Sequence, residues 1–296
     1  MRAALVAALA TLLFGCGTPP LALPPGPADA PQGPWRQQTY AIPMRDADGA
    51  MRMLLSRVCR PEGDGPARLV VIAHGSPPVA ADRAKFRLLN CDDEAPRWFL
   101  QRGFVVAEAL RRGYGGTGGP YLESSSDCSA PSYERSARES ARDLQAVVDY
   151  ATALPFVRPD GATLVGQSAG GWATLGMDSL PHPKLMALVS MAGGRGGHAG
   201  NVADRNCKPE NLAAAAGALG RSATTPMLWI YTENDSFFAP PIARAIYDAF
   251  TASGGQAEFH QLGPFANDGH RLFFGRGGSA VWGPLMERYL HGRGVF

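Results

Sequence analysis

At 296 residues the chain has the length of one large domain or two small ones, and 45% hydrophobic residues exclude global disorder. Charged residues make up only 18%, the formal net charge is +2, and no run of five or more basic residues occurs. This pattern argues against a nucleic-acid partner, because a surface that tracks phosphates is strongly basic.

The N-terminal residues predict an export signal. Arg2 supplies a positive charge, and residues 3–14 are almost wholly apolar but shorter than the roughly 20 residues that span a bilayer. The run ends in Leu-Phe-Gly-Cys, which resembles a bacterial lipobox with Cys16 as the lipidated residue. The alternative is an ordinary secretory signal cut nearby. We predict a signal peptide over residues 1–15 and export to the bacterial cell envelope or periplasm.

A proline-rich segment follows and carries seven prolines between residues 18 and 34. Such a composition favours an extended chain over a packed core. We predict a tether over residues 16–34 and one domain over residues 35–296. A lipid anchor at the start of the tether would be the protein's only attachment to a membrane.

The rest of the chain alternates strands and helices. Eight segments read as strands by their apolar, β-branched content: 35–45, 50–59, 68–73, 104–110, 162–165, 185–191, 226–231 and 257–262. Four read as helices: 132–154, the stretch after residue 168, 242–253 and 281–290. Short buried strands alternating with helices predict an α/β fold with a mainly parallel sheet, whose sites form at the carboxyl ends of the strands.

A Gly-x-Ser-x-Gly pattern lies at one such strand end. The segment Ala162–Val165 leads into Gly166-Gln167-Ser168-Ala169-Gly170, and a helix-compatible stretch follows. This is the context of a nucleophile elbow, in which a serine sits on a tight strand-to-helix turn. Glycines at the two flanking positions avoid a clash where the chain closes on itself. We predict Ser168 as a nucleophile.

A serine nucleophile needs a base, and the base needs an acid to orient it. His270 follows the last predicted strand, so it is the predicted base, with His198 on a glycine-rich loop as the alternative. The acid is expected after a strand between nucleophile and base, which favours Asp235 over Glu233.

The oxyanion of the reaction needs main-chain N–H donors. We predict those of Ala169, next to the nucleophile, and Ser76, in the His-Gly-Ser loop after the strand 68–73. The predicted lining of a substrate pocket is a set of ring-bearing residues near the strand ends, namely Tyr114, Trp172, His198 and Phe237.

These motifs together resemble the α/β-hydrolases of the dienelactone hydrolase and prolyl-oligopeptidase-like group. The matching elements are His74-Gly75-Ser76, the glycine-rich run 112–119, Gly166–Gly171, Tyr231–Asp235 and Asp268-Gly269-His270. The resemblance implies an eight-stranded, mainly parallel sheet and a triad of Ser168, Asp235 and His270. Dienelactone hydrolases proper use a cysteine nucleophile, so the serine here points to ester or amide hydrolysis.

Four cysteines beyond Cys16 fit no zinc-binding spacing, and we expect neither a metal nor another cofactor. Export favours disulfides, and one bridge is expected rather than two. In the implied fold, Cys128 and Cys207 lie in connections that reach the site and are the predicted pair. Cys59 ends an antiparallel strand at the opposite edge and is predicted to be an unpaired buried thiol.

The predicted function is a serine carboxylesterase that acts on a small-molecule ester or acyl substrate. A serine peptidase of the oligopeptidase type and a non-catalytic envelope lipoprotein of the same fold are the alternatives. The sequence leaves the oligomeric state open.

Overall fold

The computed structural model describes residues 23–125, 127–181 and 185–296. The predicted signal peptide and Cys16 lie outside these residues. Among the described helices, none combines the length and the apolar character that crossing a bilayer requires.

One sheet of nine strands forms the centre of the domain, in the order β1-β2-β3-β5-β4-β6-β7-β8-β9. The strands are β1 Gly26–Pro27, β2 Gln38–Arg45, β3 Met51–Cys59, β4 Ala67–Ala73, β5 Phe104–Ala109, β6 Val157–Gln167, β7 Leu185–Met191, β8 Met227–Thr232 and β9 Ala257–Leu262. From β5 to β9 all neighbours are parallel, and the pairs β1–β2, β2–β3 and β3–β5 are antiparallel. The predicted α/β class is confirmed. The sheet has one strand more than predicted, because Gly26–Pro27 adds to its edge.

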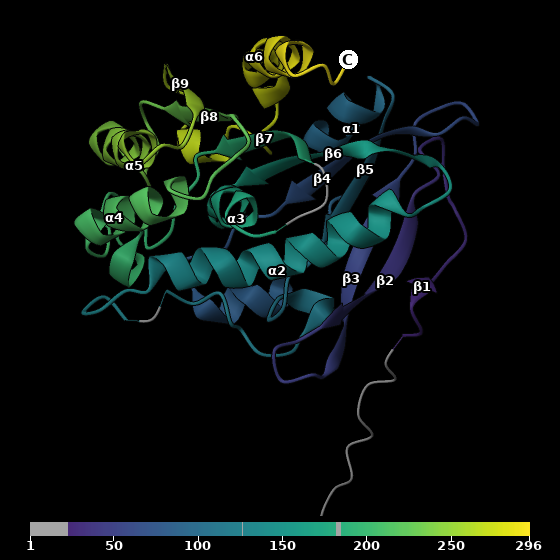
Figure 1. The fold of residues 1–296 in the computed structure, drawn as a ribbon, viewed down its shortest axis with the longest axis horizontal. Coiled ribbons are helices and arrows are strands. Elements are labelled where there is room, and N and C mark those ends of the chain that lie inside the picture. The colour runs from purple at the N-terminus through teal and green to yellow at the C-terminus, as the bar shows by residue number, and fades with distance from the viewer. Residues whose placement is uncertain (1–22, 126, 182–184) are drawn as a thin grey trace, which may run out of the picture.

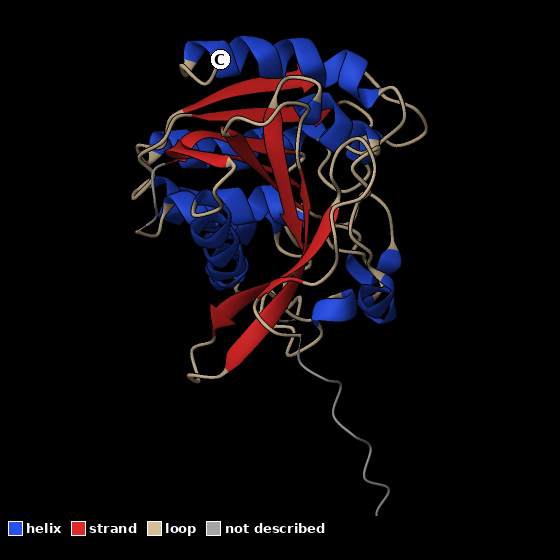
Figure 2. Ribbon diagram, turned by 90° about the vertical axis from the view of Figure 1, so that its right-hand side faces the viewer, coloured by secondary structure: helices blue, strands red, loops and turns tan. Residues whose placement is uncertain are grey.

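Helices cover both faces of the sheet (Figures 1 and 2). The longer ones are α1 Glu94–Leu100, α2 Tyr133–Thr152, α3 Ala169–Asp178, α4 Pro209–Gly220, α5 Pro240–Ala252 and α6 Gly278–Gly292. Residues of α2, α3, α4 and α5 share one hydrophobic core, and α1 and α6 share the core on the other face. The sheet is therefore packed on both faces, and the loops at its edge are the segments left to form a site.

The predicted helix over 132–154 is α2, and its apolar residues recur at three- and four-residue spacing. Ala137, Ala141, Leu144, Val148 and Ala151 are all buried. This spacing places them on one stripe of the helix, and the stripe packs onto the sheet.

Two disulfides join the described cysteines, not one. The predicted Cys128–Cys207 bridge is present, with Cα atoms 5.0 Å apart. The prediction of an unpaired Cys59 is wrong, because Cys59 bonds Cys91 over a Cα separation of 5.8 Å. The connection after β4 does not stay at the active-site edge. Leu89 N donates to the Glu108 carboxylate of β5, and Cys91 N donates to Gln37 Oε1, so the connection runs across the sheet toward Cys59.

Part of the proline-rich segment lies against the sheet. Gly26 and Pro27 pair with Ala41 and Tyr40 of β2, and Gln32 forms an isolated bridge with Gln37. The part of the predicted tether that the structure describes therefore packs against the domain.

Candidate active site

The turn between β6 and α3 has the geometry of a nucleophile elbow. Ser168 adopts φ 57° and ψ −120°, a conformation that costs a non-glycine residue energy. A Cβ on Gly166 would lie 2.1 Å from the carbonyl oxygen of Gly170, and a Cβ on Gly170 would lie 2.1 Å from that of Ala73. Gly166 is therefore required by the close approach within the turn that the pattern predicts, and Gly170 by the close approach of β4, which the pattern did not indicate.

Asp235 and His270 meet beyond the ends of β8 and β9. His270 Nδ1 lies 3.0 Å from Asp235 Oδ1 and 3.1 Å from Oδ2. The same Oδ1 accepts the main-chain N–H groups of Phe237 at 2.8 Å and Phe238 at 2.9 Å. Both Asp235 and His270 are buried. The carboxylate is thus fixed by its own loop and faces the imidazole.

The side chain of Gln167 joins this pair to the elbow. Its Nε2 donates to the carbonyl oxygen of His270 at 2.9 Å, over a sequence separation of 103 residues. Gln167 immediately precedes Ser168, so the backbone of His270 is held beside the elbow. Within the described part of the chain, no hydrogen bond joins Ser168 Oγ to His270 Nε2.

Aromatic stacking orients the His270 ring further. The Phe237 ring stacks on it with centroids 4.1 Å apart, and the His198 ring stacks on the other face of Phe237 at 3.5 Å. His198 Nε2 lies 2.9 Å from Ser236 Oγ. Asp268 accepts hydrogen bonds from Ser236 Oγ and from the main-chain N–H of His270. His198, the alternative base, therefore lies behind Phe237 and supports the His270 loop.

The His-Gly-Ser loop after β4 lies against the elbow, since a Cβ on Gly75 would lie 3.3 Å from the Cβ of Ser168. His74 Nδ1 donates to the carbonyl oxygen of Gly75 at 2.7 Å, and its Nε2 accepts the N–H of Arg111. Burial, reinforced by Arg111, lowers the pKa of His74 to about 3, so the ring is neutral. The carbonyl of Gly75 faces this ring. Because a trans peptide points its N–H the opposite way, the N–H of Ser76 faces away from it.

A buried ionic cluster supports this loop, and sequence reasoning did not find it. Arg111 donates to Glu123 through Nε at 2.5 Å, and Arg195 Nη2 donates to the other Glu123 oxygen at 2.7 Å. Tyr114 Oη also donates to Glu123. Burial would raise the pKa of Glu123, but the two guanidiniums outweigh it and hold the pKa well below its usual range. The cluster is a charged framework under the site.

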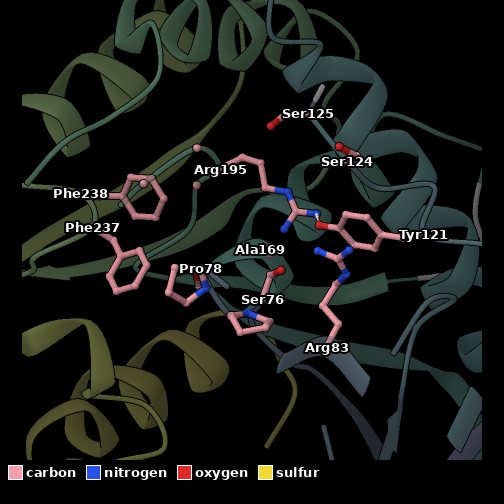
Figure 3. Close-up of a pocket in the computed structure, with 15 residues that line it drawn as sticks. Ser76, Pro78, Arg83, Tyr121, Ser124, Ser125, Ala169, Arg195, Phe237 and Phe238 are labelled. Atoms are coloured by element: carbon pink, nitrogen blue, oxygen red, sulfur yellow. Dashed lines mark hydrogen bonds between the residues drawn. The ribbon is translucent and has the colours of Figure 1, made fainter. Parts of the chain in front are cut away.

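A cavity of about 200 Å³ opens beside Ser168 (Figure 3). The predicted lining residue Phe237 borders it, as do Ser76 and Ala169, the predicted oxyanion donors. Phe238, Gly194, Arg83 and Arg195 are among the other lining residues. The predicted lining by Tyr114 and Trp172 is not observed. Tyr114 is buried in the ionic cluster with its hydroxyl 2.8 Å from Ser76 Oγ, and Trp172 packs in the core and donates to the carbonyl of Tyr133. His198 does not line the cavity and stacks on the Phe237 ring instead.

The described residues contain no group of three or more His, Cys, Asp or Glu side chains arranged to hold a metal ion. Asp235 can orient the His270 imidazole for proton transfer, and main-chain N–H groups at the strand ends can donate hydrogen bonds.

This sheet, the elbow and the order of the strand-end loops are those of an α/β-hydrolase. A model of the prolyl oligopeptidase family matches residues 91–193, the part of the chain that contains the elbow. The predicted resemblance is thereby confirmed. No curated protein matches the chain by sequence.

Solved structures support the same assignment of the fold. A Klebsiella pneumoniae protein assigned as a dienelactone hydrolase is similar over 86% of this chain and 97% of its own, with TM-score 0.58 and 17% identity. An acetyl xylan esterase from Paenibacillus sp. R4 is similar over 86% and 84%, with TM-score 0.58 and 14% identity. An acylaminoacyl peptidase from Pyrococcus horikoshii is similar over 88% of this chain but only 42% of its own, with TM-score 0.61 and 14% identity. At these identities the neighbours show the α/β-hydrolase fold alone and leave the choice between ester and peptide open.

Proposed function

We propose that the protein is a serine carboxylesterase with Ser168 as nucleophile, His270 as general base and Asp235 as the residue that orients and stabilises the imidazole. The observation that carries the proposal is the Asp235–His270 pair fixed beside a strained Ser168 elbow. Asp235 binds Nδ1–H, which leaves Nε2 as the nitrogen that accepts a proton.

In the first step Ser168 Oγ attacks the ester carbonyl carbon while its proton passes to His270 Nε2. The tetrahedral oxyanion is stabilised by the N–H groups of Ala169 and Ser76, each worth about 3 kcal/mol. His270 then gives its proton to the leaving alkoxide, and the C–O bond breaks to give alcohol and an acyl-enzyme. Water, deprotonated by His270, attacks the acyl carbon, and the acid leaves as Ser168 recovers its proton.

The cavity favours a small substrate. Its volume of about 200 Å³ is below the roughly 300–1,000 Å³ of pockets for drug-sized ligands. Export with a lipid anchor at Cys16 remains part of the proposal. The two disulfides are consistent with an oxidising compartment.

A serine peptidase is the second candidate, because the family model that matches the elbow region is that of the prolyl oligopeptidases. Hydrolysis of p-nitrophenyl acyl esters compared with peptide anilides separates the two candidates.

The test of the common mechanism is labelling by a fluorophosphonate probe. We expect labelling of the wild type and none of Ser168→Ala, while Ser179→Ala, a serine at the far end of α3, should label like the wild type. Equal labelling of wild type and Ser168→Ala would refute the assignment, and absence of labelling in folded wild type would favour the non-catalytic alternative.

A further inference from the structure

The cavity beside Ser168 has one cationic wall and one apolar wall. Arg83, Tyr121 and Arg195 lie on one side, and Phe237 and Phe238 lie on the other (Figure 3). Among the described residues that line the cavity, none is an aspartate or a glutamate. Two guanidiniums stabilise an anion more strongly than a neutral ester, so this wall calls for an explanation beyond the cleavage of neutral esters.

Arg195 is a buried cation, and one nitrogen of its guanidinium has no hydrogen-bond acceptor among the described residues. Its Nε donates to Ser136 Oγ at 3.0 Å, and its Nη2 donates to Tyr121 Oη at 2.8 Å and to Glu123. Within the described part of the chain its Nη1 makes no hydrogen bond, yet this atom is not shut off from solvent. A donor is therefore available on the cavity side of a rigidly held guanidinium.

The charge of Arg195 is only partly neutralised. Its carboxylate partner, Glu123, is shared with Arg111, whose Nε donates to it at 2.5 Å. His74, against the same cluster, is neutral because burial lowers its pKa. Two guanidiniums and one carboxylate leave a net positive charge under the cavity. Electrostatic attraction is stronger in such a poorly solvated place than in water.

Arg83 supplies the second cation from the short 3-10 helix η1 (Ala80–Lys85). Its guanidinium carbon lies 3.8 Å from the centre of the Tyr121 ring, and that of Arg195 lies 5.8 Å from the same ring. No hydrogen bond or ion pair of the Arg83 side chain occurs within residues 23–296 as described. Tyr121 thus holds Arg83 at the cavity without using its donors.

We propose that Arg83 and Arg195 bind a carboxylate of the substrate, so that the enzyme acts on small esters that carry a second, anionic group. This rests on the proposed esterase function. Guanidinium forks match the geometry of a carboxylate, and such charge-assisted hydrogen bonds are stronger than neutral ones. The apolar wall of Phe237 and Phe238 packs against the hydrocarbon part of the substrate. Arg83 is then a specificity-determining residue.

Matched esters test the charge preference. Monomethyl succinate and methyl succinamate differ in a carboxylate against a carboxamide on the acyl side, and 4-acetoxybutanoate and 4-acetoxybutanamide differ in the same way on the alcohol side. For at least one pair we expect the wild type to favour the anion at least tenfold in kcat/KM, measured by pH-stat at low ionic strength. Equal rates, or faster cleavage of the neutral ester in both pairs, would overturn the proposal.

Variants of Arg83 assign the effect, because replacing buried Arg195 could unfold the protein. Arg83→Gln should lower the anion-to-neutral ratio about tenfold, Arg83→Lys less, and Arg83→Glu should reverse it. The control is Arg87→Gln, since Arg87 donates only to main-chain carbonyls of Ala84 and Phe86. A ratio that Arg83→Gln leaves as in the wild type would refute the role of Arg83.

Binding to a Ser168→Ala variant separates the two proposals. Calorimetry with monomethyl succinate and methyl succinamate should show tighter binding of the anion, and adding Arg83→Gln should remove the difference. If the anion binds selectively but no ester is cleaved by the wild type, the anion site stands and the esterase function fails. If esters are cleaved without charge preference and neither ligand binds selectively, the function stands and the anion site fails.

Discussion

Replacement of Asp235 by asparagine is the sharpest test of the arrangement, because the surrounding hydrogen bonds dictate how the new side chain must sit. Oδ1 accepts the N–H groups of Phe237 and Phe238. In Asp235→Asn the amide oxygen must take this place, since two buried N–H groups would otherwise lose their acceptor at about 1–3 kcal/mol each. The NH₂ group then takes the place of Oδ2, 3.1 Å from His270 Nδ1.

That position reverses the polarity of the contact. The NH₂ group can only donate. Oδ1 also lies 3.0 Å from Nδ1, but it already accepts two N–H groups, and a proton on Nδ1 would meet the amide hydrogen of the variant. We therefore expect His270 Nδ1 to become an acceptor and its proton to move to Nε2. An imidazole that already carries its proton on Nε2 cannot accept the proton of Ser168. The corresponding change in a trypsin-type triad costs about 10⁴ in kcat, or about 5 kcal/mol, and we expect a loss of that order here.

The assay is kcat/KM for p-nitrophenyl acetate, with thermal unfolding to show that the variant is folded. The matched control is Glu233→Gln, because Glu233 is an exposed acid on the same loop and was the alternative acid by sequence. It should stay within about twofold of the wild type. If folded Asp235→Asn keeps more than a tenth of the wild-type kcat/KM, the assigned role is wrong.

Two further predictions concern stability. Burial raises the pKa of Glu108 to about 7 from an ordinary 4.5, so the folded state holds its proton more tightly than the unfolded state, and stability falls as pH rises from about 4.5 to 7. Glu108→Gln should remove roughly 3 kcal/mol of this loss, which urea unfolding at pH 4 and pH 8 would show; an unchanged pH dependence would contradict it. For the Cys128–Cys207 bridge, which closes a separation of 79 residues, the double serine variant should lose about 4 kcal/mol of unfolding free energy. Without reductant the four bridged cysteines should resist alkylation, which the mass of the protein before and after treatment would show. Complete alkylation of the four would refute both bridges.

The elbow could be predicted from the sequence because its causes are local. Gly166 is required by a contact within the turn itself, with the backbone of Gly170, and strand and helix signals lie on either side. Gly170 is required by a more distant contact, with Ala73 of β4. The partners Asp235 and His270 followed from the order of strands in a parallel sheet, which brings successive strand ends to one edge.

The cationic wall could not be predicted in this way. Tyr121 and Arg195 are 74 residues apart and meet through irregular loops, for which the sequence carries no periodic signal. Helix α4 was missed because its run of alanines is apolar without a period, and α1 because it has seven residues and contains Pro96. The Cys59–Cys91 pair depends on the route of a loop across the sheet, which no local pattern specifies.

Strand β1 has a practical consequence for work with shortened versions of this protein. Ala28 N donates to Thr39 O, and Asp29 Oδ1 accepts the N–H of Thr39, so the docked segment occupies polar groups along the outer side of β2. A version trimmed to begin at Trp35 would leave that side bare, and bare strand edges template sheet-to-sheet aggregation. Recombinant material should therefore begin before Gly26, so that β1 is kept and a loss of solubility is not mistaken for a loss of catalysis.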